Sequence, residues 1–304
     1  MSNFTSKYID LSNISTEGVN HQTKNIDTLK TIQLVHLINK QDQSIALAVK
    51  SQLKNIAIAI DKIVYAFNHR GRLIYIGAGT SGRLGVLDAS EMPPTYGVSD
   101  KLVIGLIAGG DAAIRKPIEG AEDNQLAVIN DLKDIRLNKR DVLVGISASG
   151  RTPYVVSGLI YANKLGCQTI SIATSHNSEI GKIAKIKIEA ITGPETIVGS
   201  TRMKSGTAQK MILNTLSTGA MIKIGKVFSN LMVDVQPTNL KLVTRAFNLV
   251  KRITKANDKD IKKIMSITHN QVKPAVIMIK KNLNYGQAKQ LLKKHRGMLR
   301  ECLK

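Results

Sequence analysis

Two short loops carry the residue types best able to bind an anion. The first, Gly77–Gly82, reads Gly-Ala-Gly-Thr-Ser-Gly, and the second, Ser147–Thr152, reads Ser-Ala-Ser-Gly-Arg-Thr. Each follows a β-type run and leads into a helical pattern. Where a strand gives way to a helix, unpaired backbone N–H groups and the helix dipole favour an anion, and hydroxyl side chains add donors. We therefore expect both loops to bind one phosphorylated small molecule.

The first loop also matches the dinucleotide-binding pattern through Gly77, Gly79 and Gly82. A dinucleotide site requires an acidic residue at the end of the second strand, and the run Leu102–Gly110 contains none. The hydroxyl residues inside the loop suit a phosphate monoester better than a pyrophosphate that approaches bare backbone. We therefore do not expect a nicotinamide cofactor.

The second loop places three hydroxyl side chains, Ser147, Ser149 and Thr152, within six residues. Simple capping of the following helix would need only one of them, so their number favours anion binding. A nucleophile elbow of the form Gly-x-Ser-x-Gly would need glycine at position 147, where serine stands. A serine hydrolase is therefore not expected.

Carboxylates supply the remaining chemistry. Glu91 follows the first helical pattern, and Pro93-Pro94 predicts an irregular segment that returns across the mouth of the sheet. An ordinary solvated glutamate at a helix end is the alternative interpretation of Glu91. Four further acids lie within Asp111–Asp123. Their spacing alone does not select one of them, because acids near helix N-termini often interact only with the helix dipole.

The elements that position these residues alternate between strand and helix, which predicts an α/β fold with a parallel sheet covered on both faces. Such a sheet places its binding site at the carboxyl ends of the strands, where both loops lie. We expect five strands, at residues 73–77, 102–108, 142–147, 169–173 and 186–191.

Three segments are predicted along the chain. Helical patterns at Ile26–Lys40 and Ile45–Asn68 place an N-terminal helical segment at residues 1–70, packed on a core at residues 71–236. The core ends in one long, mainly buried helical pattern, Lys204–Phe228, whose glycines weaken the expectation of continuity. Short helical patterns without strands then predict a small helical domain at residues 237–304.

Composition limits the class of protein. The 304-residue chain has a net charge of +22, and residues 239–304 hold 17 Lys or Arg against 3 Asp or Glu. Because Trp is absent and Phe is scarce, aromatic platforms for nucleic acid are missing, and a solvated basic surface is favoured. Cys167 and Cys302 match no disulfide framework or zinc spacing. Residues Met1–Lys7 lack a signal-peptide pattern, and no apolar run could cross a membrane, so a cytoplasmic protein is expected.

The longest motifs resemble a known family. They are Ile74–Glu91, Glu119–Asp123, Ser147–Tyr154, Gly193–Glu195 and Gly199–Lys210. Together they resemble the N-acetylmuramic acid 6-phosphate etherase family, which belongs to the sugar isomerase (SIS) domain proteins. The resemblance implies a five-stranded SIS-type sheet, a homodimer and no metal or other cofactor.

The resemblance also implies the reaction. The D-lactyl ether at C3 of N-acetylmuramic acid 6-phosphate is cleaved to give N-acetylglucosamine 6-phosphate and D-lactate, in cell-wall amino sugar recycling. The open-chain aldehyde at C1 acidifies the hydrogen on C2, a base removes that proton, lactate leaves C3, and water adds to the unsaturated aldehyde. By matching motifs, Glu91 occupies the proton-donor position and Glu122 the second active-site position. Two acid/base steps agree with two carboxylates.

The same resemblance assigns the sugar-phosphate contacts, with Lys204 as the weaker candidate: Gly79, Ser81, Ser147, Ser149, Gly150, Thr152 and Lys204. One departure concerns the start of the chain, where the family often carries Thr-Glu-x-Arg-Asn and this sequence has no arginine before Asn20. A non-catalytic SIS-domain sensor of sugar phosphates is the alternative function. The presence of both Glu91 and Glu122 argues against it.

Overall fold

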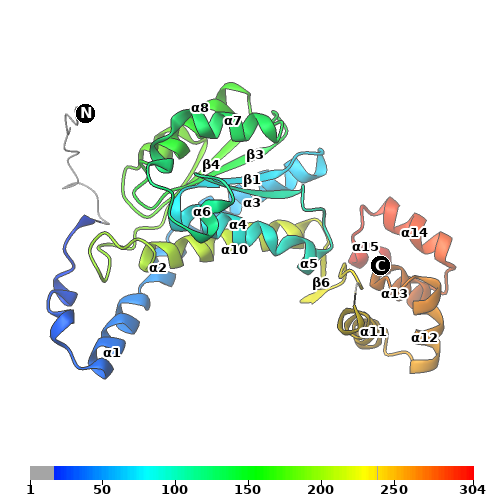
Figure 1. The fold of residues 1–304 in the computed structure, drawn as a ribbon. Helices are drawn as coiled ribbons and strands as arrows, with labels where there is room; N and C mark the ends of the chain where they lie inside the picture. Colours follow the sequence, from blue (N-terminus) through cyan, green and yellow to red (C-terminus); the bar gives the residue numbers. More distant parts are fainter. Residues whose placement is uncertain (1–16, 238) are drawn as a thin grey trace.

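A parallel five-stranded sheet forms the centre of the protein (Figure 1), in a computed structural model that describes residues 17–237 and 239–304. The predicted α/β class is confirmed. The strand order is β2-β1-β3-β4-β5, and each strand lies within two residues of its predicted ends. The strands are β1 (Leu73–Gly77), β2 (Val103–Ile107), β3 (Val142–Ile146), β4 (Gln168–Ala173) and β5 (Ile186–Glu189).

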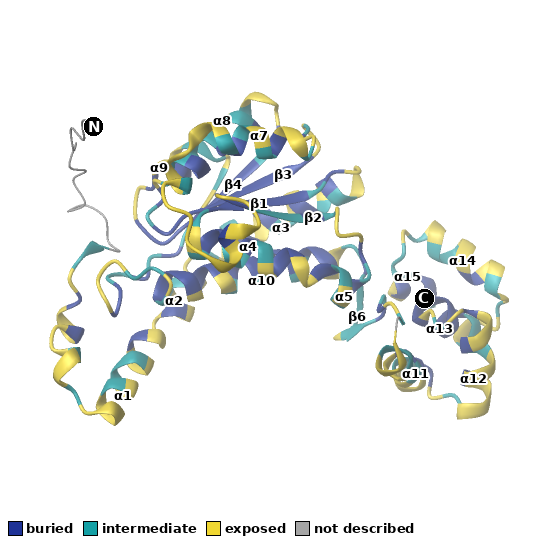
Figure 2. Ribbon diagram, viewed as in Figure 1, coloured by how far each residue is buried: buried dark blue, intermediate teal, exposed yellow. Residues whose placement is uncertain are grey.

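The central strands are apolar on both faces because both faces are covered. In β1, Leu73 and Tyr75 pack into one core, while Ile74 and Ile76 pack into the other. This is the alternation of side chains expected along a strand. All five residues of β1 and of β3 are buried, and Figure 2 shows the sheet enclosed between exposed helical surfaces.

Two helical layers produce this burial. On the face of Leu73 and Tyr75 lie α3 (Leu53–Asn68), α4 (Gly79–Ser90) and α10 (Lys204–Lys223). On the face of Ile74 and Ile76 lie α7 (Gln125–Asp134) and α8 (Pro153–Lys164). The short helices α5 (Met92–Tyr96), α6 (Ala112–Arg115) and α9 (Glu179–Ile183) complete the connections.

The long helix α10 is continuous through Gly206 and Gly219, and it ends before Gly225, whose φ is +80°. It is therefore shorter than the predicted Lys204–Phe228 pattern. At Gly219 an added Cβ would lie 2.6 Å from Cδ1 of Ile60. Glycine at this position thus allows α10 to pack closely on α3, which explains why it is tolerated inside a buried helix.

The N-terminal segment projects from the sheet (Figure 1) and comprises η2 (His21–Thr23), η3 (Ile26–Thr28), α1 (Thr31–Asp42) and α2 (Ile45–Lys50). It is tied to the core where the Thr23 hydroxyl donates to the Thr196 carbonyl at 2.8 Å. The predicted helix at 45–68 is divided at Ser51 and Gln52 into α2 and α3. The leader Met1–Lys7 lies outside the described residues.

The C-terminal segment has a hydrophobic core of its own. It contains α11 (Leu240–Thr254), α12 (Asp258–Ile267), α13 (Val272–Lys281), α14 (Tyr285–Lys294) and α15 (Leu299–Leu303). A hairpin that sequence reasoning missed, β6 (Val227–Phe228) and β7 (Leu231–Met232), packs with these helices. Its strands are too short to show a periodicity of two. The division of the chain at 70 and 236 remains a prediction.

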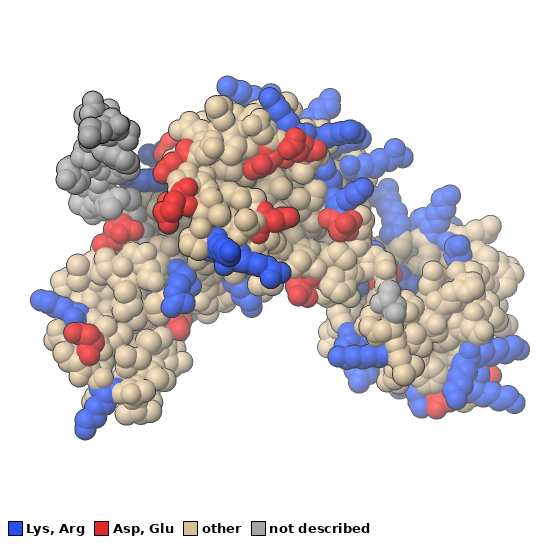
Figure 3. Space-filling model, in the orientation of Figure 1, with Lys and Arg blue, Asp and Glu red and all other residues tan. Residues whose placement is uncertain are grey.

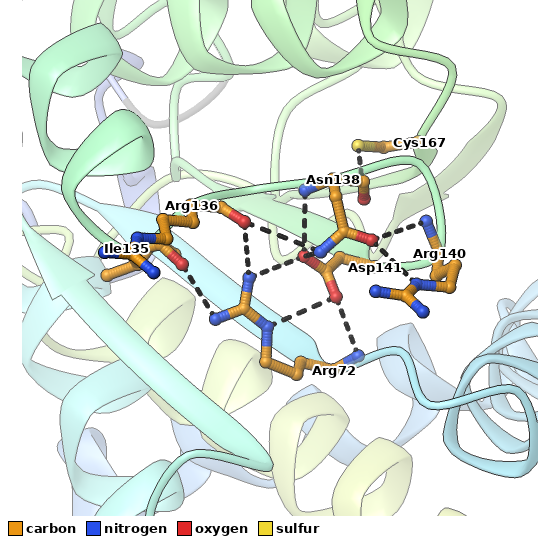
Figure 4. Close-up of polar contacts among 7 residues, drawn as sticks. All are labelled: Arg72, Ile135, Arg136, Asn138, Arg140, Asp141 and Cys167. Atoms are coloured by element: carbon orange, nitrogen blue, oxygen red, sulfur yellow. Dashed lines mark hydrogen bonds and ion pairs between the residues drawn. The ribbon is translucent and has the colours of Figure 1, made fainter.

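At the amino ends of the strands, a buried ion pair joins the approaches to β1 and β3 (Figure 4). Asp141 is 1% exposed, and its carboxylate accepts from Arg72 Nη2 at 2.7 Å and from the backbone N–H groups of Arg72 and Asn138 at 3.0 Å each. This network joins the residues that precede β1 and β3, and it can hold the two central strands in register. The two loops lie at the opposite edge of the sheet, where β1 and β3 have their carboxyl ends.

Candidate functional site

The hydroxyl groups of the second loop, Ser147–Thr152, lie close to one another. The Ser147 hydroxyl lies 2.8 Å from that of Thr152 and 3.4 Å from that of Ser149, and the N–H of Gly150 donates to Ser147 Oγ at 3.0 Å. Thr152 occupies the N-cap position of α8 but makes no capping hydrogen bond. The cluster therefore offers three hydroxyls at a helix N-terminus, as anion binding requires and simple capping does not.

The shape of this loop depends on Gly150, which has a φ of +73°. A Cβ at this position would lie 2.2 Å from the Cβ of Ser178. Ser178 is in turn held by Glu189, whose Oε1 accepts from its N–H at 2.9 Å and from its hydroxyl at 2.8 Å. Side chains from β5 and from the start of α9 thus fix the backbone that carries the hydroxyls.

The first loop lies beside the second because Gly77 of β1 is in register with Ile146 of β3. Gly79 has a φ of +51° and begins α4. The Ser81 hydroxyl is buried and donates to Oε1 of Gln209 on α10 at 2.9 Å. The loop is therefore braced by α10, and direct contact of Ser81 with a phosphate remains a prediction.

Gln209 is a candidate that sequence reasoning did not select, although it lies within the motif Gly199–Lys210. Its side chain is 1% exposed. Within the described residues, its Nε2 has no hydrogen-bond partner. A buried amide left without an acceptor is costly, and such groups often mark a ligand site. Only the contact with Ser81, 128 residues earlier, reveals its position near the first loop.

Glu122 lies beside the first loop. It belongs to the turn η4 (Ala121–Asp123) and is exposed. Together with Gly79 and Arg83 it lines a cavity of about 200 Å³. Arg83 donates from Nε to the Ile114 carbonyl at 3.0 Å, which joins α4 to the segment that leads to Glu122. Of the two predicted catalytic glutamates, the fold brings this one to the first loop of its own chain.

Glu91 lies at the other end of α4, as the C-cap residue of this 12-residue helix. At 1.5 Å rise per residue, it is roughly 18 Å from the first turn. It lines a separate cavity of about 270 Å³ with Leu87, Asp88 and Lys210, among others. Within one chain, the two glutamates therefore line different cavities.

The segment after Glu91 differs from the prediction. The irregular return across the mouth of the sheet is wrong, because Met92–Tyr96 forms the short helix α5. Pro93 and Pro94 fall in its first turn, where backbone N–H groups have no intrahelical acceptor and proline is tolerated. The chain thus continues away from the loops and does not fold back over them.

Asp88 is buried beside Glu91 and was also missed. Its carboxylate accepts from Tyr75 Oη at 2.9 Å, from Asn214 Nδ2 at 2.8 Å and from Ser217 Oγ at 3.0 Å. Burial raises the pKa of Asp88, and the hydrogen bonds to the carboxylate oppose that rise. The only sequence signal is an acid on a buried helical face three residues before Glu91. Asp88 joins α4 to β1 and α10.

Lys204, the first residue of α10, is buried, and its Nζ donates to the Pro194 carbonyl at 3.0 Å. Burial lowers the pKa of Lys204. The fully buried Glu195 caps the helix by accepting from the N–H groups of Lys204 and Ser205 at 2.9 Å each. Lys204 lines neither cavity that contains a catalytic candidate, and its contact with substrate remains a prediction.

Two kinds of feature are absent from residues 17–237 and 239–304. No three side chains among His, Cys, Asp and Glu come together as a metal site would need in this part of the chain. None of the helices described there is both long and apolar enough to cross a membrane.

Comparisons with known proteins match the chain to two SIS-domain models and to proteins of similar length. Residues 55–163 match the model of the glucokinase regulatory protein N-terminal SIS domain, and residues 131–218 match the SIS domain model. A Clostridium botulinum (strain Hall) protein named N-acetylmuramic acid 6-phosphate etherase is 53% identical over 97% of this chain and 98% of its own length. A Lactobacillus acidophilus protein of the same name is 51% identical over 97% of this chain and 99% of its own length.

Solved structures match less closely. A protein of E. coli CFT073, solved in complex with a ligand, aligns with a TM-score of 0.48 at 21% identity, covering 64% of this chain and 94% of that one. The phosphoheptose isomerase of Neisseria gonorrhoeae aligns with a TM-score of 0.48 at 15% identity, covering 62% of this chain and 97% of that one.

Proposed function

The chain belongs to the N-acetylmuramic acid 6-phosphate etherase family, and from this premise we propose that it cleaves the D-lactyl ether of N-acetylmuramic acid 6-phosphate. The products are N-acetylglucosamine 6-phosphate and D-lactate, formed by elimination and water addition as in a carbon–oxygen lyase. The enzyme acts in the cytoplasm, in the recycling of cell-wall amino sugar. The observation that carries the proposal is the hydroxyl cluster of Ser147, Ser149 and Thr152.

The substrate phosphate binds at this cluster. A phosphate oxygen can accept from each hydroxyl and from backbone N–H groups at the start of α8, where the helix dipole adds favourable interaction. Gly150, with a φ of +73° and no Cβ, lets the loop pack against Ser178 and so hold the hydroxyls in place. Gly79 lets the first loop approach in the same way, and the orphan amide of Gln209 lies behind Ser81 as a further donor.

The elimination needs a carboxylate to remove the C2 proton and a group to protonate the departing lactate oxygen. Glu122 lies beside Gly79 and is positioned to act on a sugar whose phosphate occupies the loops. Glu91 of the same chain is one helix length away. The second carboxylate of the site therefore comes from another copy of the chain.

The surface around Glu91 supports a homodimer. Leu87, one turn before Glu91, is 54% exposed, and it lines the cavity that contains Glu91. The N-terminal segment adds three more exposed apolar side chains, Ile32, Val35 and Leu47. A second copy that covers these apolar side chains would remove them from water. A second copy packed on α4 and the N-terminal segment would place its Glu91 at the phosphate loops of the first copy.

The activity is tested by incubating the purified protein with N-acetylmuramic acid 6-phosphate, with EDTA present and no added nucleotide. We expect stoichiometric release of D-lactate and N-acetylglucosamine 6-phosphate. Tight binding of the sugar phosphate without lactate release would instead establish a sensor.

The composite site is tested by mixing two inactive variants, Glu91→Gln and Ser149→Ala, after reversible dissociation. If Glu91 acts on the partner's loops, each mixed dimer contains one site without a lesion and one with both. Activity should then rise to about a quarter of the wild-type value in a random mixture. If both residues act within one chain, every site keeps a lesion and mixing restores nothing.

A further inference from the structure

A cavity of about 570 Å³ lies between the C-terminal helices and the chain on either side of the β6–β7 hairpin, where Lys226 and the segment Val233–Pro237 line it. Its lining includes three lysines, Lys226, Lys273 and Lys289, together with His269 and one acid, Asp234. Neither phosphate loop contributes to it, and neither predicted catalytic glutamate lines it. The etherase reaction therefore leaves this cavity without a role.

The charges inside the cavity are unequal. A single oxygen, Asp234 Oδ2, lies 2.6 Å from Lys273 Nζ and 3.0 Å from Lys226 Nζ. The two ammonium groups thus share one negative charge, and one positive charge is left over. The Lys273 side chain is 8% exposed and that of Lys226 is 22% exposed, so water screens this excess poorly.

A purely structural role would not require this arrangement. One lysine would suffice to join Asp234 to α13, and the second ammonium adds repulsion that the carboxylate only partly offsets. Burial accordingly lowers the pKa of Lys273, against the attraction of Asp234. An anion seated between the two ammonium groups would remove the imbalance.

The rest of the lining suits an anion that carries a polar body. Lys289 and His269 are exposed at the rim and add donors. Gln236 and Gln271, the N-cap residue of α13, also line the cavity. Gln271 Oε1 accepts from Tyr285 Oη at 3.1 Å, which leaves its amide nitrogen as the donor for a ligand. The volume lies within the range of about 300–1,000 Å³ typical of small-molecule sites. A phosphorylated ligand of monosaccharide size matches both the charge and the volume.

We propose that this cavity is a second anion site, which binds a phosphorylated small molecule of monosaccharide size through Lys226, Lys273 and Lys289. The site is separate from the phosphate loops at the carboxyl ends of β1 and β3. It does not depend on the etherase activity. Gln236 donates to the Gly97 carbonyl of the core at 3.3 Å. A ligand in this cavity would therefore also lie against the contact between the core and the C-terminal helices.

Calorimetric titration of the full chain tests the proposal, with glucose 6-phosphate and inorganic phosphate as probes at constant ionic strength. A triple variant, Ser147→Ala with Ser149→Ala and Thr152→Ala, removes all three hydroxyls of the loop site, so that the remaining binding reports the cavity. We expect one glucose 6-phosphate per chain in that variant. Adding Lys273→Met should weaken this binding about tenfold or more, as loss of a charged hydrogen bond implies. Unchanged affinity after Lys273→Met in this background would overturn the proposal.

Two further variants separate the site from general basicity and from misfolding. Lys262→Met removes one charge from the exposed face of α12 and should leave the affinity unchanged. Lys289→Met alters only the exposed rim, where folding is not at risk, and should weaken binding severalfold. Equal effects of Lys262→Met and Lys289→Met would show that surface charge alone attracts the probe, and the proposal would fail. Lys273→Met leaves Lys226 and Asp234 as a balanced pair, which protects the fold.

Discussion

At the scale of single residues, the second loop depends on Gly150 for its shape. Gly150→Ala would place a Cβ 2.2 Å from that of Ser178 at a φ of +73°. We expect a loss of about 2–4 kcal/mol in the free energy of unfolding, from backbone strain and overpacking combined. Urea unfolding measures it. The control Gly110→Ala has a similar φ of +68° but open space around the new Cβ, and should lose only about 1 kcal/mol. Equal losses would contradict the steric argument.

Cys167 gives a second prediction at this scale. Burial and the neighbouring Asp141 raise the pKa of its thiol to about 11. Because the thiolate is the reactive form, a thiol reagent at pH 8 should label Cys167 slowly in the native protein and rapidly in urea. The measurement uses a Cys302→Ser background to report this thiol alone. Rapid labelling of the folded protein would show that the thiol is accessible and ionised.

The clustering of the three hydroxyls in the second loop could be predicted from the sequence, because all three lie within six residues of one another. It did not predict Gln209 or Asp88, whose roles arise from contacts across more than a hundred residues of chain. Ser81 meets Gln209 at a separation of 128 residues, and Asp88 meets Asn214 at 126. Such contacts follow only from the packing of α10 on α4.

At the scale of elements, α4 carries a phosphate-loop residue at one end and a catalytic candidate at the other, and its length keeps the two apart. Ser81 lies in its first turn and Glu91 caps its last. The existence of this helix was predictable, and so was Glu91 as a candidate. The direction in which α4 carries Glu91 away from the loops was not, because proline was expected to turn the chain back and instead began α5.

Asp88 provides the prediction at this scale, since it joins α4 to α10. Burial raises its pKa above the ordinary value of 3.8, so the folded state binds its proton more tightly than the unfolded state. The stability from this group is full below the unfolded pKa and declines as pH rises through the folded pKa. The difference in unfolding free energy between wild type and Asp88→Asn should therefore fall as the pH is raised above the ordinary carboxyl pKa of 3.8. Parallel urea-unfolding profiles over that rise in pH would exclude the shift.

At the scale of the whole molecule, basic side chains are spread over the core and the C-terminal helices (Figure 3). They are not gathered into one stripe on the visible face, and the scarcity of aromatic residues leaves no platform for bases. A solvated basic surface remains the interpretation, and the absence of a nucleic-acid partner remains a prediction. The same surface would attract anionic substrates.

The proposed homodimer gives a prediction at this scale. Leu87→Glu places a charge in the apolar surface beside Glu91 and should yield a monomer with little etherase activity. Leu126→Glu is the matched control, because Leu126 is 72% exposed on α7, across the sheet from α4. Light scattering coupled to size exclusion should show a dimer for the control. A Leu87→Glu protein that stays dimeric and active would place the interface elsewhere.

The hydroxyl cluster of the second loop has a consequence for the speed and selectivity of capture. Ser147 and Thr152 hydrogen-bond each other in the free protein, while the backbone beneath them is fixed by Gly150 and its neighbours. An arriving phosphate therefore needs only rotation about Cβ–O bonds, in which one set of hydrogen bonds is exchanged for another. Binding of this kind is preorganised: it orders little additional chain, and poorly accepting anions such as chloride gain little from the exchange.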